Sequence, residues 1–165
     1  MKNTMYWLIG IVVVLALLTL GVKLMPKGQA KIGLVAGQLS PCPNTPNCVC
    51  SEGESPSAYV APFAFKGEAA SAWLRVKQAI VANGGRIQTQ EPTYLTASFI
   101  TKWLGFVDDV ELRLDADNGV IHVRSASRLG RSDFGINRAR VERLRLLFNS
   151  SLSQLENNEF TAQKK

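Results

Sequence analysis

GFVDDVELRLDADNGVIHVRSASRLGRSDFGINR, residues 105–138, is the stretch that decides the fold of this chain. Apolar and polar residues alternate along 106–114 and again along 120–127, which is the period of a half-buried β-strand. Asn118-Gly119 between them is a dipeptide that favours the tight turn of a β-hairpin. A polar loop containing two further glycines follows. The stretch therefore predicts two antiparallel strands, a loop and the start of a helix.

The turn also predicts a register for this hairpin. If Asn118-Gly119 is a two-residue turn, Asp115 faces His122 and Arg113 faces Arg124 across the ladder. Like charges directly opposite each other in a sheet are unfavourable. Either the register shifts, or an acidic group or an anion lies between the two arginines.

Two helices and two further strands are predicted around the hairpin. Apolar residues at helical spacing indicate a helix over 68–83, and residues 86–90 and 94–103 are candidate strands. A closing helix has the apolar stripe Ile136, Val141, Leu144, Phe148, Leu152 and Leu155. The predicted class is α+β, a two-layer sandwich in which two helices cover one face of a four-stranded antiparallel meander. The other face, predicted to meet water or a polar partner, carries Glu111, Arg113, His122 and Arg124.

The N-terminal region is strongly apolar. The run 5–25 has about the 20 residues that a helix needs to cross a bilayer, and Tyr6 and Trp7 lie near one end of it, as interfacial aromatics do. We therefore predict a single-pass transmembrane anchor at 1–25. A linker at 26–40, an α+β domain at 41–156 that includes a Cys/Pro loop, and a polar tail at 157–165 follow. A signal peptide cleaved after Ala30 is the alternative.

Two observations bear on where the domain faces, and they disagree. More lysines follow the apolar run than precede it, and the positive-inside rule then leans toward a cytoplasmic domain. A disulfide would require an oxidising compartment instead. We predict a bacterial inner-membrane protein whose soluble domain faces the periplasm, with a cytoplasm-facing domain as the alternative.

The segment PCPNTPNCVCS, residues 41–51, contains all three cysteines of the chain. Its prolines and asparagines predict a rigid, turn-rich loop. Cys42 and Cys48 enclose a short stretch, so a disulfide between them is the first hypothesis, with Cys50 left buried or free. The cysteine spacing does not match the usual zinc patterns, and no metal or cofactor is predicted.

Three stretches of the chain are similar to the sequences of a known family: CPNTPNCV at 42–49, VDDVE at 107–111 and RSASRLGRSDFGINR at 124–138. They resemble the domain-of-unknown-function family 1499 (DUF1499), over roughly Leu39 to Phe148. The resemblance implies a protein of bacteria or plastid-bearing organisms, often behind a membrane or export segment, with no established activity. The family's usual pattern after the second cysteine is Val-Ser-Ser, so Cys50 departs from it.

The charge of the chain is unevenly distributed. The formal net charge is +6, and seven arginines lie between Arg124 and Arg145. This balance favours anionic partners such as small anions, lipid headgroups or acidic proteins. Nucleic acid is a poor candidate, because Phe134 is the only aromatic residue among these arginines. A solvated basic helix face is the alternative.

The candidate site lies in the same region. Asp108 falls on the apolar face of its strand, where a carboxylate needs an arginine or backbone donors, and Arg124, Arg128, Arg131 and Arg138 are the available cations. In one interpretation these groups form a structural network that holds the loop 130–135 to the sheet. In the other they form an anion pocket. The predicted ligand-binding residues are Asp108, Arg124, Ser125, Ser127, Arg128, Ser132, Asn137 and Arg138.

The predicted function is non-enzymatic: binding of an anionic small molecule, a lipid headgroup or a protein partner, with the membrane itself as a partner of the anchor. No catalytic residue is assigned, because the chain has no nucleophile elbow, Gly-rich phosphate loop or histidine cluster. The alternatives are a hydrolase-like enzyme that uses the Asp, Ser and Arg side chains, and a structural accessory subunit of a membrane complex.

Overall fold

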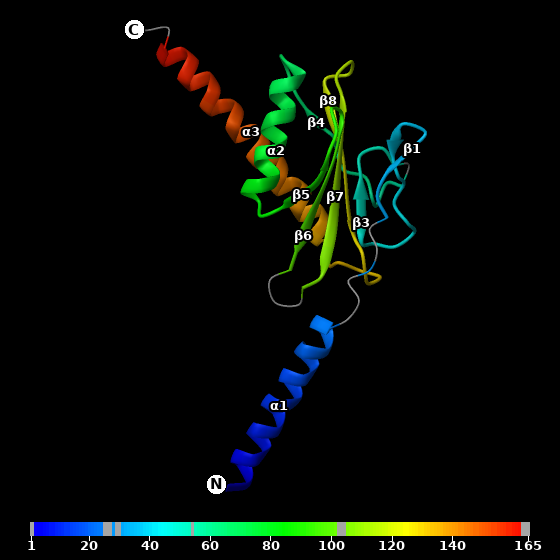
Figure 1. Cartoon of the computed structure of the whole chain (residues 1–165), viewed down its shortest axis with the longest axis vertical. Coiled ribbons are helices and arrows are strands. Elements are labelled where there is room, and N and C mark those ends of the chain that lie inside the picture. The colour runs from blue at the N-terminus through cyan, green and yellow to red at the C-terminus, as the bar shows by residue number, and fades with distance from the viewer. Residues whose placement is uncertain (1, 25–27, 29–30, 54, 102–104, 163–165) are drawn as a thin grey trace.

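The computed structural model describes residues 2–24, 28, 31–53, 55–101 and 105–162 (Figure 1). An N-terminal helix extends away from a mixed α and β body (Figure 1). In chain order the elements are α1 (Lys2–Leu24), β1 (Leu34–Val35), β2 (Gln38–Leu39), β3 (Cys48–Cys50), β4 (Phe63–Ala64), α2 (Ala69–Ala82), β5 (Arg86–Gln90), β6 (Tyr94–Ile100), β7 (Val107–Asp115), β8 (Val120–Ser127) and α3 (Ile136–Ala162).

The main sheet is antiparallel and has six strands in the described part of the chain, so the predicted four-stranded meander is wrong. Strands β5, β6, β7 and β8 are neighbours in that order, but β3 and β4 both pair with β8. The free edge of β8 would otherwise leave backbone donors and acceptors unpaired. β3 and β4 are too short to produce an alternating sequence pattern. A separate ribbon contains β1 and β2.

The register of the β7–β8 hairpin also differs from the prediction. The turn spans 116–119, so Arg113 pairs with His122 and Arg124 pairs with Glu111. Two arginines therefore do not face each other. Instead, the ladder sets a guanidinium opposite a carboxylate, which is the favourable cross-strand arrangement.

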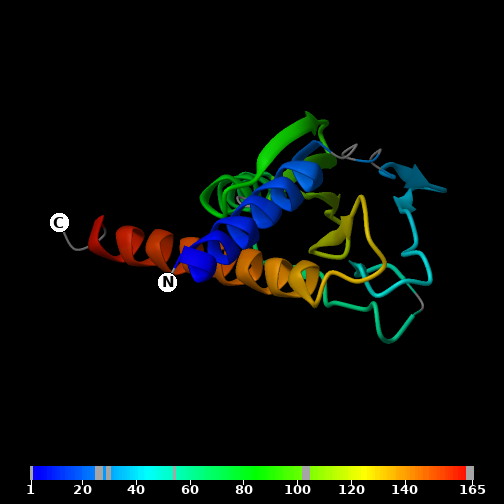
Figure 2. The same cartoon turned by 90° about the horizontal axis from the view of Figure 1, so that it is seen from below.

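The core lies between the sheet and the two helices α2 and α3, which cover the same face of the sheet (Figure 2). Helix α2 ends where Gly84 takes a positive φ of 83°, the conformation that glycine adopts most easily. Burial of apolar surface on this side supplies most of the folding free energy. The fully buried large side chains of the core are Phe63, Val76, Ile80, Leu95, Val110, Leu112, Ile121, Val123, Val141, Leu144 and Phe148.

The opposite face of the sheet does not meet water as predicted. The segment 31–39, which includes β1 and β2, lies against it (Figure 1). The backbone N–H of Gly33 donates to Oε2 of Glu111 at 2.7 Å, and Nη1 of Arg124 donates to the carbonyl of Lys31 at 3.1 Å. Glu111 and Arg124 are consequently buried.

Two arginines of α3 hold the long segment between β3 and α2. Arg138 donates to the carbonyls of Tyr59 and Ser57 at 2.9 and 2.8 Å. Arg145 donates to the carbonyls of Pro62 and Ala61 at 2.8 and 2.5 Å. These charge-assisted bonds satisfy carbonyl groups of a segment that has little secondary structure of its own.

The predicted transmembrane anchor is not supported. A helix needs about 20 predominantly apolar residues to cross a bilayer, and among the described residues no helix is both long and apolar enough to do so. The prediction of a single-pass protein of the bacterial inner membrane is therefore corrected. Apolar side chains between Met5 and Leu20 of α1 are exposed.

Candidate functional site

The disulfide loop, defined as residues 42–48, is the centre of the candidate site. Cys42 and Cys48 form the predicted disulfide, with Cα atoms 5.6 Å apart. Asn47 attaches the loop to the rest of the domain, because its Nδ2 donates to the carbonyl of Gly130 at 2.6 Å. The carbonyl of Asn47 accepts from the backbone N–H of Ser127 at 3.0 Å. The loop is thus held next to the segment that follows β8.

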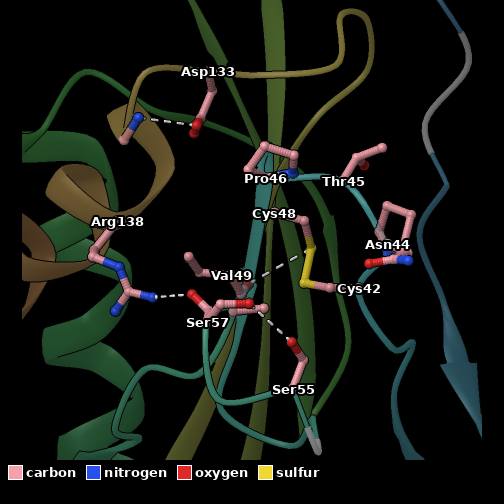
Figure 3. A pocket seen from close by; sticks show the side chains of 13 residues that line it. Cys42, Asn44, Thr45, Pro46, Cys48, Val49, Ser55, Ser57, Asp133 and Arg138 are labelled. Atoms are coloured by element: carbon pink, nitrogen blue, oxygen red, sulfur yellow. Dashed lines mark hydrogen bonds between the residues drawn. A yellow bond between two sulfur atoms is a disulfide. The ribbon is translucent and has the colours of Figure 1, made fainter.

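A first cavity of about 280 Å³, here called the disulfide cavity, lies between this loop, residues 55–58 and the start of α3 (Figure 3). Arg138 lies at its edge and donates to the carbonyl of Ser57. The carboxylate of Asp133 accepts from the backbone N–H groups of Gly135 and Asn137, at 3.0 and 2.7 Å, and so satisfies donors at the start of α3. The lining residues are Cys42, Pro43, Asn44, Thr45, Pro46, Cys48, Val49, Ser55, Ser57, Ala58, Asp133, Gly135 and Arg138.

A second cavity of about 230 Å³, here called the arginine cavity, shares Pro43 and Thr45 with the first. It lies beside the face of the sheet that carries Arg124 and Arg128. Three cationic side chains and one carboxylate are among its lining residues, which are Lys31, Pro43, Thr45, Asn47, Asp109, Arg124, Ala126, Ser127, Arg128 and Gly130.

Arg124 is the most deeply buried cation of the arginine cavity, with 3% of its surface exposed. Its Nη1 donates to Oε1 of Glu111 at 2.7 Å and to the carbonyl of Lys31 at 3.1 Å. Its Nε is buried and has no hydrogen-bond partner in the described part of the chain. Glu111 also accepts from the hydroxyl of Tyr94 at 2.5 Å. Burial, and then this bond to Glu111, raises the pKa of Tyr94.

Arg128 and Asp109 form the second ion pair of the arginine cavity. Nε and Nη2 of Arg128 donate to the two carboxylate oxygens of Asp109, both at 2.8 Å. This fork geometry is the strong form of an arginine–carboxylate pair. The hydrogen bonds that Arg128 donates to Asp109 raise the pKa of Arg128. Arg128 is therefore positioned by its partner.

Four of the predicted site residues belong to a hydrogen-bonded network between the sheet and α3, in which Asp108, Ser125 and Asn137 are buried and Ser127 is partly buried. Arg140, which the sequence prediction missed, connects this network. Its guanidinium donates to Asp108 at 2.5 Å, to Asn137 at 2.6 Å and to Ser125 at 3.2 Å. Only Ser127 of these four also lines the arginine cavity.

Arg140 also corrects the predicted partner of Asp108, for which Arg124, Arg128, Arg131 and Arg138 were the candidates. A sequence signal for it exists, because Arg140 follows Asn137 by three positions and precedes Leu144 by four. On a helix these positions share one face. Ser132 does not line either cavity, and its hydroxyl accepts from the backbone N–H of Phe134 at 3.3 Å.

A further polar cluster escaped the sequence analysis. The hydroxyl of Ser51 lies 3.2 Å from Nδ1 of His122, and Nε2 of the same ring lies 3.7 Å from both Glu52 and Asp115. The hydroxyl accepts from the backbone N–H of Val123 at 2.9 Å, and Ser51 is buried. Burial lowers the pKa of His122. Neither Ser51 nor His122 lines the disulfide cavity or the arginine cavity.

Within the described residues, no group of three or more His, Cys, Asp and Glu side chains is placed to hold a metal ion. Comparison with protein families gives one match: the model of a family described as a protein of unknown function, DUF1499, matches residues 38–148. No curated protein matches the chain significantly. The matched range contains the disulfide loop and the lining of both cavities except Lys31.

Proposed function

The chain belongs to the DUF1499 family, whose description names no activity, and from the arginine cavity we propose that its domain binds a small anion. The ligand is an oxyanion, either a phosphate or a carboxylate. The observation that carries the proposal is the buried, unpartnered Nε of Arg124 beside a cavity with an excess of cationic side chains.

The hydrogen bonding of Arg124 indicates that its guanidinium can take a further acceptor. A buried donor without a partner costs about 1–3 kcal/mol. Glu111 and the carbonyl of Lys31 both occupy Nη1, so the guanidinium edge that contains Nε is not used by them. An arginine edge of this kind matches the oxygens of a carboxylate or phosphate. An anion that reached this edge of the guanidinium from the cavity would complete the hydrogen bonding of the side chain.

The charges and size of the cavity agree with a small anion. Lys31, Arg124 and Arg128 line it, and because Glu111 pairs with Arg124 and Asp109 with Arg128, one net positive charge is left for a ligand. Thr45, Asn47 and Ser127 add hydroxyl and amide groups to the lining of the cavity. Its volume of about 230 Å³ is below the roughly 300–1,000 Å³ typical of sites for drug-sized ligands. A ligand with few heavy atoms fits these limits.

Titration calorimetry with inorganic phosphate, and separately with acetate, tests the proposal on the full chain. A mild detergent keeps the chain dispersed, because α1 exposes apolar side chains. Lys31→Ala removes an exposed cation of the cavity and should weaken binding, and Arg124→Lys should weaken it further, because lysine lacks the Nε edge. Lys66→Ala, an exposed lysine outside the cavity, is the matched control. Absence of binding, or equal loss in the control, would contradict the proposal.

The buried network around Arg140 gives the hydrolase alternative little support. Asp108 and Ser125 are bound to Arg140, and Ser125 also donates to Asn137 at 2.6 Å. These groups are packed against α3 and have their hydrogen bonds satisfied by one another. A network of this kind pins elements together, which is the structural interpretation of the Asp, Ser and Arg residues.

A further inference from the structure

We infer that the Cys42–Cys48 disulfide regulates the arginine cavity: reduction of the bridge by a dithiol lowers the affinity of the cavity for an anion. This inference rests on the proposed function. It is carried by the position of the disulfide loop, because Pro43 and Thr45 line both cavities and Asn47 lines the arginine cavity.

The two ends of the disulfide loop are held in different ways. At the Cys48 end, Asn47 donates to the carbonyl of Gly130, and its own carbonyl accepts from Ser127 and from Nδ2 of Asn137, both at 3.0 Å. Cys48 itself begins β3, which pairs with β8. This end of the loop therefore stays attached to the sheet whether or not the disulfide is present.

At the Cys42 end, the attachment depends on the bridge. The carbonyl of Pro43 accepts from the backbone N–H of Thr45 at 2.7 Å, which is a bond within the loop. The hydroxyl of Thr45 donates to Asn47 at 2.7 Å, again within the loop. Cys42 packs beside the small cluster of Leu39, Cys50 and Tyr94 and is partly exposed. The covalent link to Cys48 thus holds the Pro43 half of the loop in place as a wall of the arginine cavity.

The bridge is accessible from the disulfide cavity. Both cysteines line that cavity, and their sulfur atoms lie among the side chains around it in the close view (Figure 3). Cys42 is the more exposed of the two residues. A small dithiol can therefore approach the sulfur of Cys42 without unfolding of the domain, whereas the Cys48 side is buried against the sheet.

The exchange is balanced as two steps. One thiolate of the dithiol attacks Sγ of Cys42, so that the Cys42–Cys48 bond breaks, a mixed disulfide forms at Cys42, and Cys48 leaves as a thiolate that takes up a proton. The second thiolate of the reductant then attacks the reductant sulfur that is bonded to Cys42. Cys42 leaves as a thiolate and takes up a proton. Two electrons pass to the protein, and the dithiol becomes a cyclic disulfide.

Reduction weakens binding because fewer molecules then have the Pro43 half of the loop in place as a wall of the arginine cavity. Once the bridge is open, residues 42–44 regain conformational freedom that the oxidised loop lacks. The apparent Kd rises in inverse proportion to the fraction of binding-competent molecules. If the wall is in place in about a tenth of the reduced molecules, anion affinity falls about tenfold.

Titration of inorganic phosphate into the full chain, oxidised or reduced with dithiothreitol, tests the inference. The expected result is an apparent Kd about tenfold higher after reduction. The double variant C42S/C48S should show the weaker affinity without any reductant, and Cys50→Ser, which leaves the bridge intact, should bind like the oxidised protein. Circular dichroism of each form confirms that it is folded.

The outcomes separate this inference from the proposed function. Equal phosphate affinity in the oxidised and reduced chains overturns the inference and leaves the anion site standing. No binding in either form overturns both. Hydrogen exchange at the amides of Thr45 and Asn47 adds a readout that needs no ligand: exchange at Thr45 should rise on reduction while Asn47 changes less, and identical exchange in both states overturns the inference.

Discussion

Arg124 and Glu111 face each other across the β7–β8 ladder, and their side chains meet with Nη1 2.7 Å from Oε1. Both side chains are almost fully buried. A buried ion pair adds little net stability, because desolvation offsets the attraction, but an unpaired half is costly. The carboxylate therefore fixes a guanidinium beside the arginine cavity that could not remain buried there alone.

Glu111→Gln should strongly destabilise the domain, because it leaves the buried charge of Arg124 uncompensated. Loss of one partner of a buried pair costs about 3–5 kcal/mol, measured here as the free energy of unfolding in urea. Glu142→Gln is the control, since the Glu142–Arg145 pair has a carboxylate side chain that is 53% exposed and should contribute less than about 1 kcal/mol. Similar effects of both substitutions would contradict the role assigned to the buried pair.

Arg140→Lys should lower stability without weakening phosphate binding. Lysine retains the charge but cannot reach Asp108, Asn137 and Ser125 together in the fork geometry of arginine. Each buried group left without a partner costs about 1–3 kcal/mol. Thermal unfolding measures the loss, and Arg143→Lys on the exposed side of α3 serves as the comparison. A parallel drop in phosphate affinity would mean that the network belongs to the binding site.

His122 should make the domain less stable in mild acid. Burial lowers its pKa in the folded protein, although Glu52 and Asp115 act in the opposite direction. The unfolded chain, with a histidine pKa of about 6.5, binds the proton first as the pH falls. The contribution of His122 is thus complete above that value and is lost as the pH falls through the lower pKa of the folded state.

The measurement for His122 is the unfolding free energy between pH 7 and pH 5 for the wild type and for His122→Gln. The wild type should lose stability over this interval and the variant should lose less. Parallel profiles would show that the ring is not the group that titrates.

Gly85→Ala should destabilise the junction between α2 and β5. A Cβ at this position would lie 2.5 Å from Cζ of Phe99 and 2.8 Å from Cγ2 of Ile80. Overpacking of this kind costs about 1–3 kcal/mol, read as a shift of the urea midpoint. Gly53→Ala is matched to it, because the added Cβ meets only Cβ of Cys50 at 3.9 Å. An unchanged midpoint for Gly85→Ala would contradict the close approach.

Thiol labelling with a maleimide should divide the three cysteines into two classes. Cys50 is 1% exposed, and burial raises the pKa of its thiol, so the native protein should take up no label. One label should enter in urea, and three in urea after reduction of the Cys42–Cys48 bridge. Three labels in urea without reductant would exclude the bridge.

The sequence signals that succeeded are local. The strand pair around Asn118-Gly119 and the disulfide between Cys42 and Cys48 both depend on residues that are near in the chain. The buried position of Asp108 followed from strand alternation, and its need for an arginine or backbone donors followed from that burial. Residue spacing carries this information because the period of apolar residues in a strand and the preferences of turn residues both extend over only a few positions of the chain.

The features that escaped prediction depend on contacts between distant segments. β3 has no pattern of its own and forms because β8 offers a free edge. The basic run did not show which arginines have partners within the chain, as Arg128, Arg138, Arg140 and Arg145 do. The arrangement of the two cavities on either side of shared residues Pro43 and Thr45 cannot be read from spacing, because the lining segments are far apart in sequence.

The bond from Asn137 to the carbonyl of Asn47 joins positions 90 residues apart and sets an order of events during synthesis. The loop with Cys42 and Cys48 leaves the ribosome long before the helix that anchors it. Cys50 packs with Leu39 and Tyr94 and pairs with Arg124 of β8. Until β6 and β8 are made, it is as available for pairing as its two neighbours, and wrong disulfides compete with the native one. Correct oxidation of the youngest chains therefore depends on residues made after the loop, so that C-terminal truncations that remove β8 and α3 should accumulate mispaired cysteines.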